Sequence, residues 1–147
     1  MKMQVLYIQK KEGAQENAEI IATAIARKYS CKSDKIPPAY PCEQEKLVVL
    51  CFETYGKPDK RLLAFCKDLS TSRASNVALV MLNNDGNTNV PESLAETFKT
   101  NGVKVTGTCG IALKKGLFSK AKLTDADVKK AMDFAEAQIT SLFDMVG

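Results

Sequence analysis

The chain has 147 residues, of which 45% are hydrophobic and 26% charged. This length and mixture suit one globular domain with a buried core, so we expect a single domain over residues 1–147. The longest apolar runs, such as Leu47–Phe52 and Val77–Leu82, are far shorter than the roughly 20 residues that a membrane span needs. No signal-peptide pattern follows Met1, and we therefore expect a cytoplasmic protein with no membrane partner.

The net charge is +4, and the chain contains no histidine. The lysines are spread along the chain and do not form the dense stripe of a nucleic-acid binder, so we expect no nucleic-acid partner. A mild positive charge favours an anionic small molecule or an acidic protein as the partner. The odd number of cysteines and the absence of a C-x-x-C pair disfavour a disulfide framework and a metal site.

Strand-like and helix-like segments alternate along the chain. Apolar or β-branched runs predict strands at residues 3–8, 31–36, 47–52, 77–82 and 103–108. Apolar residues at helical spacing predict helices at residues 14–29, 58–69, 91–99 and from 124 to about 142. This order predicts a mostly parallel sheet with right-handed crossovers and helices on both faces.

The sequence also predicts which side of the first helix is buried and where two other helices begin. The first helix should bury a stripe that contains Ile20, Ile21, Ala24 and Ile25. Pro58 suits the first position of the second helix. The last helix should begin with a capping box that starts at Thr124.

Parallel sheets bind ligands where the carboxyl ends of their strands meet. Three predicted loops leave these ends, at Gln9–Ala14, Glu53–Lys57 and Asn83–Asn89. We expect a binding site among them.

The chain resembles the short-chain flavodoxins from Met3 to about Leu142. Asn17–Ala26 resembles the first helix of that family, usually written T-E-K-I-A-E-A-I-A, and Thr54–Pro58 resembles the loop in which an aromatic-glycine pair lies beside the flavin ring. Thr124–Phe134 is similar to the start of the last helix. The resemblance implies a flavodoxin-like three-layer α/β/α sandwich with a five-stranded parallel sheet in the order 2-1-3-4-5. It also implies FMN as the cofactor and electron transfer as the activity.

The phosphate-binding motif of the family, S/T-x-T-G-N-T, is eroded. Gln15-Glu16-Asn17-Ala18 stands at the T-G-N-T positions, and only Asn17 matches. No hydroxyl side chain lies near Gly13 in place of the family's earlier serine or threonine. A carboxylate about 5 Å from a phosphate charge is repelled by roughly 3 kcal/mol at an effective dielectric of 20. That energy corresponds to about a hundredfold in affinity.

The resemblance nevertheless assigns seven residues to the cofactor site. They are Gly13 and Asn17 for the phosphate, Thr54, Tyr55 and Gly56 for the ring face, and Asn84 and Gly86 for the ring edge. The loop that contains Asn84 has no aromatic residue, so a solvated turn explains it equally well. For Tyr55 the alternative is a loop tyrosine packed on the protein surface.

Two functions therefore stay open, and so does the question whether the chain is an enzyme. It is either an FMN-binding electron-transfer or small flavin-dependent redox protein, or a flavin-free binding or structural domain that has lost its cofactor site. A flavin reductase that uses NAD(P)H would need a nicotinamide site, and the sequence indicates none. A response-regulator receiver shares the strand order but needs acidic and lysine residues at strand ends, where this chain has Cys51 and Cys109.

Cys51 and Cys109 should lie two strands apart at the carboxyl ends. The spacing between strands puts them about 9 to 10 Å from each other, too far for a disulfide. Each is either a small buried apolar residue or a reactive thiol.

Overall fold

The computed structural model describes residues 2–10, 16–113 and 123–143. Along the chain the elements are β1 (Met3–Tyr7), α1 (Asn17–Lys28), β2 (Lys32–Lys35), β3 (Leu47–Glu53), α2 (Lys60–Asp68), β4 (Asn76–Asn83), α3 (Glu92–Asn101), β5 (Lys104–Ala112) and α4 (Asp125–Leu142). No helix within the described ranges has the length and apolar character that crossing a membrane requires.

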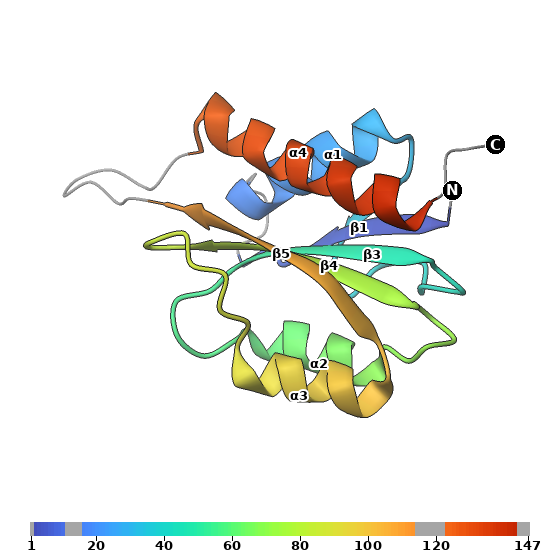
Figure 1. The fold of residues 1–147 in the computed structure, drawn as a ribbon. Helices are drawn as coiled ribbons and strands as arrows, with labels where there is room; N and C mark the ends of the chain where they lie inside the picture. Colours follow the sequence, from blue (N-terminus) through green and yellow to red (C-terminus); the bar gives the residue numbers. More distant parts are fainter. Residues whose placement is uncertain (1, 11–15, 114–122, 144–147) are drawn as a thin grey trace.

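The five strands form one parallel sheet in the order β2-β1-β3-β4-β5, which confirms the predicted topology. Helices α1 and α4 cover one face of the sheet, and α2 and α3 cover the other (Figure 1). The molecule is therefore the expected three-layer sandwich.

Successive side chains of a strand point to opposite faces of the sheet. In the central strands both sets of side chains are apolar and buried, as in a sheet covered on both faces. Val49 and Cys51 of β3 pack into the core under α1 and α4, whereas Val48 and Leu50 pack into the core under α2 and α3. In contrast, β2 has the sequence Lys-Ser-Asp-Lys, and this polar strand forms one edge of the sheet, as predicted.

The buried stripe of α1 differs from the predicted one. Its fully buried residues are Ala18, Ile21, Ala22, Ile25 and Ala26. Ile20 and Ala24 are only partly buried, so the prediction was wrong for these two. The observed stripe begins two residues earlier at Ala18, and its small side chains let the helix lie close to the sheet.

The prediction that Pro58 begins α2 was also wrong. The helix begins at Lys60, and Asp59 is its N-cap residue, whose side chain accepts a hydrogen bond of 2.8 Å from the Arg61 backbone N–H. An aspartate that satisfies a free helix donor fixes the helix start more strongly than the preferred φ of the preceding proline. The capping box of α4 between Thr124 and Asp127 is confirmed.

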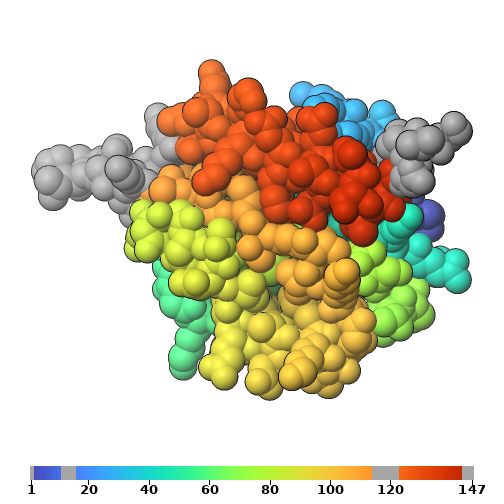
Figure 2. Space-filling view, viewed as in Figure 1, coloured from blue at the N-terminus to red at the C-terminus, as the bar shows by residue number. Residues whose placement is uncertain are grey.

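Strand β5 extends beyond its predicted end and pairs with β4 as far as Ala112. It contains two glycines, Gly107 and Gly110, which weaken the strand pattern in the sequence. At Gly110 an added Cβ would collide with the backbone carbonyl oxygens of Gly86 and Asn87. The loop after β4 thus rests directly on the backbone of β5, and the two lie side by side in the space-filling view (Figure 2).

Substitution of Gly110 by alanine should lower the free energy of unfolding by about 1–3 kcal/mol, because a backbone must move to admit the methyl group. Gly107→Ala is the matched control, since the nearest atoms to its methyl group would belong to the side-chain end of Gln138. Urea denaturation of both variants measures the difference. Equal losses of stability in the two variants would mean that the loop after β4 moves as easily as a side chain does.

Replacement of Asp59 by alanine should cost about 1 kcal/mol of stability at neutral pH, because α2 loses its N-cap hydrogen bond. Asp59→Asn keeps a capping oxygen and removes only the charge, so it serves as the control. Chemical denaturation of the three proteins gives both differences. A fully stable Asp59→Ala variant would contradict the assigned cap.

The charge of Asp59 should also make stability depend on pH. Partial burial acts to raise the pKa of Asp59, but hydrogen bonds and the positive charge from Arg61 hold it below its usual value. The folded pKa therefore lies below the unfolded value of about 3.9, and the stabilisation is present above that pH. It is lost as the pH falls through the folded pKa, so the gap between wild type and Asp59→Asn should shrink from pH 7 to about pH 3. A gap that stays constant over this range would rule out the ion pair as its source.

Candidate functional site

Three loops leave the carboxyl ends of β1, β3 and β4 at the same edge of the sheet. Hydrogen bonds continue the strand pairing past the strand ends, from Ile8 N to Cys51 O (3.2 Å) and from Thr54 N to Leu82 O (2.8 Å). The loops therefore start side by side. The common edge of the three loops is confirmed, and it is the candidate site.

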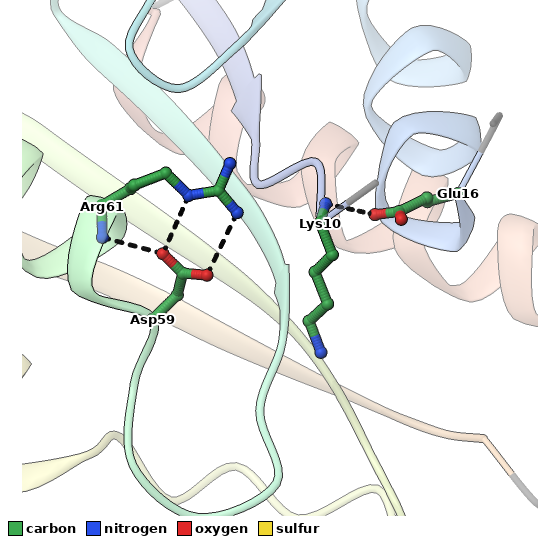
Figure 3. A network of polar contacts seen from close by, with 4 residues as sticks. All are labelled: Lys10, Glu16, Asp59 and Arg61. Atoms are coloured by element: carbon green, nitrogen blue, oxygen red, sulfur yellow. Dashed lines mark hydrogen bonds and ion pairs between the residues drawn. The ribbon is translucent and has the colours of Figure 1, made fainter. Parts of the chain in front are cut away.

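A hydrogen bond joins the two described ends of the connection between β1 and α1. Glu16 is the N-cap residue of α1, and its Oε1 accepts a hydrogen bond of 2.7 Å from the Lys10 backbone N–H (Figure 3). A carboxylate at this end of a helix is favoured by the helix dipole. A carboxylate of the chain itself, that of Glu16, thus lies at the start of α1. Sequence analysis had identified Glu16 only as a source of repulsion.

Two predicted phosphate residues lie in this loop or directly after it. Asn17 is the first residue of α1 and is partly buried. Gly13 lies outside the described residues. Their assignment to a phosphate stays a prediction.

An ion pair between Arg61 and Asp59 lies across the edge from Glu16 (Figure 3). Arg61 Nη2 is 3.2 Å from Asp59 Oδ2, and Arg61 Nε is 3.3 Å from Asp59 Oδ1. The hydrogen bond to Asp59 raises the pKa of Arg61, partial burial opposes this, and the charge of Glu16 adds a smaller increase. Asp59 therefore holds the guanidinium of Arg61 in place at this edge.

The second loop presents a tyrosine ring. Tyr55 is 37% exposed, and its hydroxyl donates a hydrogen bond of 2.7 Å to Glu53 Oε1. Burial and then this hydrogen bond raise the pKa of Tyr55, so the phenol is neutral. Lys10 Nζ lies 5.2 Å from the ring centroid, within cation–π range. The ring is thus fixed at its hydroxyl end and has a cation over it.

The residues beside Tyr55 complete this loop. Thr54 is partly buried and begins the loop through its hydrogen bond to β4. Gly56 has a φ of +114°, which favours glycine. An added Cβ there would meet no atom within 4 Å, so the space above Gly56 is open.

The third loop is organised by Asn83, a buried residue that sequence analysis did not identify. Its Oδ1 accepts hydrogen bonds from the backbone N–H groups of Gly86 (2.6 Å) and Asn87 (3.1 Å), and its Nδ2 donates one to Asn87 O (3.0 Å). Asp85 Oδ1 accepts a further bond from Asn87 Nδ2. The sequence feature that could have indicated this role is an asparagine at the end of an apolar strand.

This network limits what the third loop offers to a ligand. The amide N–H of Gly86 is already bonded to Asn83, and Gly86 packs against Ala112. Asn84 is exposed. The role of Asn84 and Gly86 at a ring edge stays a prediction.

Both cysteines near this edge are buried thiols. Cys51 pairs with Val80, and Val80 pairs with Cys109, so the two cysteines lie two strands apart as expected. Burial raises the pKa of both thiols. Both pack in the core under α1 and α4, which fits small apolar residues and not nucleophiles. Within the described residues, no cluster of three or more metal-ligand side chains occurs.

The fold is similar to three solved flavodoxin structures. The flavodoxin of Streptococcus pneumoniae TIGR4 superposes with a TM-score of 0.59 and is 14% identical in sequence, over 95% of this chain and 98% of that one. Two-electron reduced Megasphaera elsdenii flavodoxin gives a TM-score of 0.57 at 15% identity, over 91% and 98%. A flavodoxin from the domain Archaea gives 0.52 at 17% identity, over 93% and 98%.

No protein-family model and no curated protein sequence matches the chain. The structural likeness nevertheless extends over nearly the whole of each compared chain, and the strand order is the one that the sequence predicted. The chain therefore has the flavodoxin-like fold.

Proposed function

We propose that this chain is a flavodoxin-like redox protein that binds FMN weakly at the carboxyl edge of its sheet. The observation that carries the proposal is the Tyr55 ring, which is partly exposed, fixed by Glu53 and followed by the open position at Gly56. A fixed aromatic ring loses little freedom when a planar ligand stacks on it. A bound flavin would supply the redox chemistry, and the loops would orient it and exclude water.

The proposed affinity for FMN is low because the part of the edge that would hold the phosphate does not suit a negative charge. Glu16 accepts the Lys10 N–H, a backbone donor at the start of the loop that the resemblance assigns to the phosphate. A phosphate near Glu16 would meet a like charge and would have to displace this hydrogen bond. The repulsion alone is roughly 3 kcal/mol at about 5 Å and an effective dielectric of 20.

The partner in electron transfer is proposed to be an acidic protein. The net charge of +4 favours approach by a negative surface. Lys10, Lys57 and Lys60 are exposed at or next to the carboxyl edge and can contribute to that attraction.

A second candidate function is a binding domain that uses no flavin. It is favoured by the way the edge satisfies its own groups, with Glu16 on the loop N–H and Lys10 over the Tyr55 ring. The two candidates differ in whether FMN saturates the protein.

Titration of the protein with FMN, followed by flavin fluorescence, should show saturation in the range of tens to hundreds of micromolar. Tyr55→Ala should weaken binding about tenfold, the equivalent of a ring contact of about 1.4 kcal/mol. Tyr40→Ala is the matched control, because Tyr40 is 67% exposed but lies outside the three loops. No saturation at millimolar FMN would overturn the proposal and favour the flavin-free domain.

Glu16→Gln should tighten FMN binding by tenfold or more, because it removes a charge and keeps an oxygen that can accept the Lys10 N–H. Riboflavin lacks the phosphate, so its affinity should not change. Glu96→Gln removes the same charge from the exposed surface of α3 and should affect neither ligand. Equal tightening of both ligands would mean that Glu16 acts through the shape of the loop and not through its charge.

A further inference from the structure

A cavity of about 200 Å³ lies on the α2 side of the sheet. One wall is the segment 37–42 that leads from β2 toward β3, and the other is the end of α2 with the turn that follows it. None of its lining residues belongs to the three loops of the carboxyl edge. The cavity is therefore separate from the proposed flavin site.

Hydrogen bonds fix the segment that forms the first wall. It begins where Ile36 N donates to Tyr7 O (2.8 Å), and Asp34 Oδ2 accepts from Ala39 N (2.7 Å). Beyond the cavity, Glu45 N donates to Arg73 O (2.9 Å) and joins this segment to the turn after α2. Three prolines in the segment restrict its backbone further.

The second wall is fixed by Asn101 at the end of α3. Its Nδ2 donates hydrogen bonds to the backbone oxygens of Cys66 (3.0 Å) and Leu69 (2.9 Å) at the end of α2. Both walls thus exist before a ligand arrives, which reduces the entropy that binding must overcome.

The interior of the cavity is apolar. It is formed by Pro37, Pro38, Pro41, Cys42, Phe65 and Leu69. Burial raises the pKa of the Cys42 thiol to about 11, with a smaller increase from Glu45 and a partial offset from Arg73. The thiol is thus neutral and acts as part of the wall. Because sites for larger ligands usually have about 300–1,000 Å³, this volume suits one bulky apolar group.

Two opposite charges, Asp68 and Arg73, also line the cavity. Both side chains are exposed, and neither forms an ion pair or a side-chain hydrogen bond with another residue in the described ranges. A ligand that pairs with both residues needs an anionic group for Arg73 and a cationic group for Asp68. It also needs an apolar group that fits between the two walls.

We propose that the cavity binds a free amino acid with a bulky apolar side chain. The side chain enters the apolar interior, the carboxylate pairs with Arg73, and the ammonium pairs with Asp68. Because both ion pairs are at the surface, most of the affinity comes from the buried side chain, and binding is in the millimolar range.

The test is an NMR titration of the full chain with L-phenylalanine, with glycine as the control that lacks the apolar group. Two analogues each lack one charge: 3-phenylpropionate has no ammonium, and phenethylamine has no carboxylate. Arg73→Gln should weaken L-phenylalanine and 3-phenylpropionate at least threefold and leave phenethylamine unchanged or tighter. Asp68→Asn should weaken L-phenylalanine and phenethylamine and leave 3-phenylpropionate unchanged or tighter.

Lys67→Gln is the matched control variant, because Lys67 is exposed beside Asp68 but does not line the cavity. It should bind all three aromatic ligands like the wild type. The proposal is overturned if L-phenylalanine does not bind at tens of millimolar, or if the shifted signals lie outside the lining residues. It is also overturned if 3-phenylpropionate binds the wild type as well as L-phenylalanine, which would indicate a carboxylate site without an ammonium contact.

Discussion

The burial of β3 and β4 on both faces is the constraint on which the rest of the molecule depends. Apolar side chains that point up and down from these strands must each be covered, and this requires a helical layer on either side. Parallel pairing then turns all carboxyl ends toward one edge. The candidate site is a consequence of that arrangement, because its three loops have no other place to emerge.

At this edge the chain satisfies by itself several groups that a ligand could use. Glu16 bonds to the backbone of the first loop, Glu53 holds the Tyr55 hydroxyl, and Asn83 closes the third loop. Each contact lowers the cost of leaving the edge without a ligand. A ligand that binds at this edge must therefore either keep these contacts or replace them.

The elements that could be predicted from the sequence are those whose pattern is local. The runs of β3 and β4 are apolar without interruption, and the capping box of α4 lies within four residues, so both were predicted correctly. The start of α2 was misplaced because Pro58 and Asp59 both suit a helix start, and only the observed hydrogen bond separates them. Asn83 was missed because a polar residue before a turn has the same sequence pattern whether it is buried or solvated. The cavity depends on segments brought together by the fold, and no local pattern indicates it.

The four buried cysteines are divided evenly between the two layers of the core. Cys51 and Cys109 lie under α1 and α4, whereas Cys42 and Cys66 lie under α2 and α3. Burial raises the pKa of each. Reaction of Cys51, Cys66 and Cys109 therefore requires their core layer to open, whereas Cys42 also lines the cavity beside α2. Chemical labelling of Cys51 and Cys109 compared with Cys66 would therefore show which core layer opens first, and oxidation of these three thiols in the folded protein would depend on the same openings.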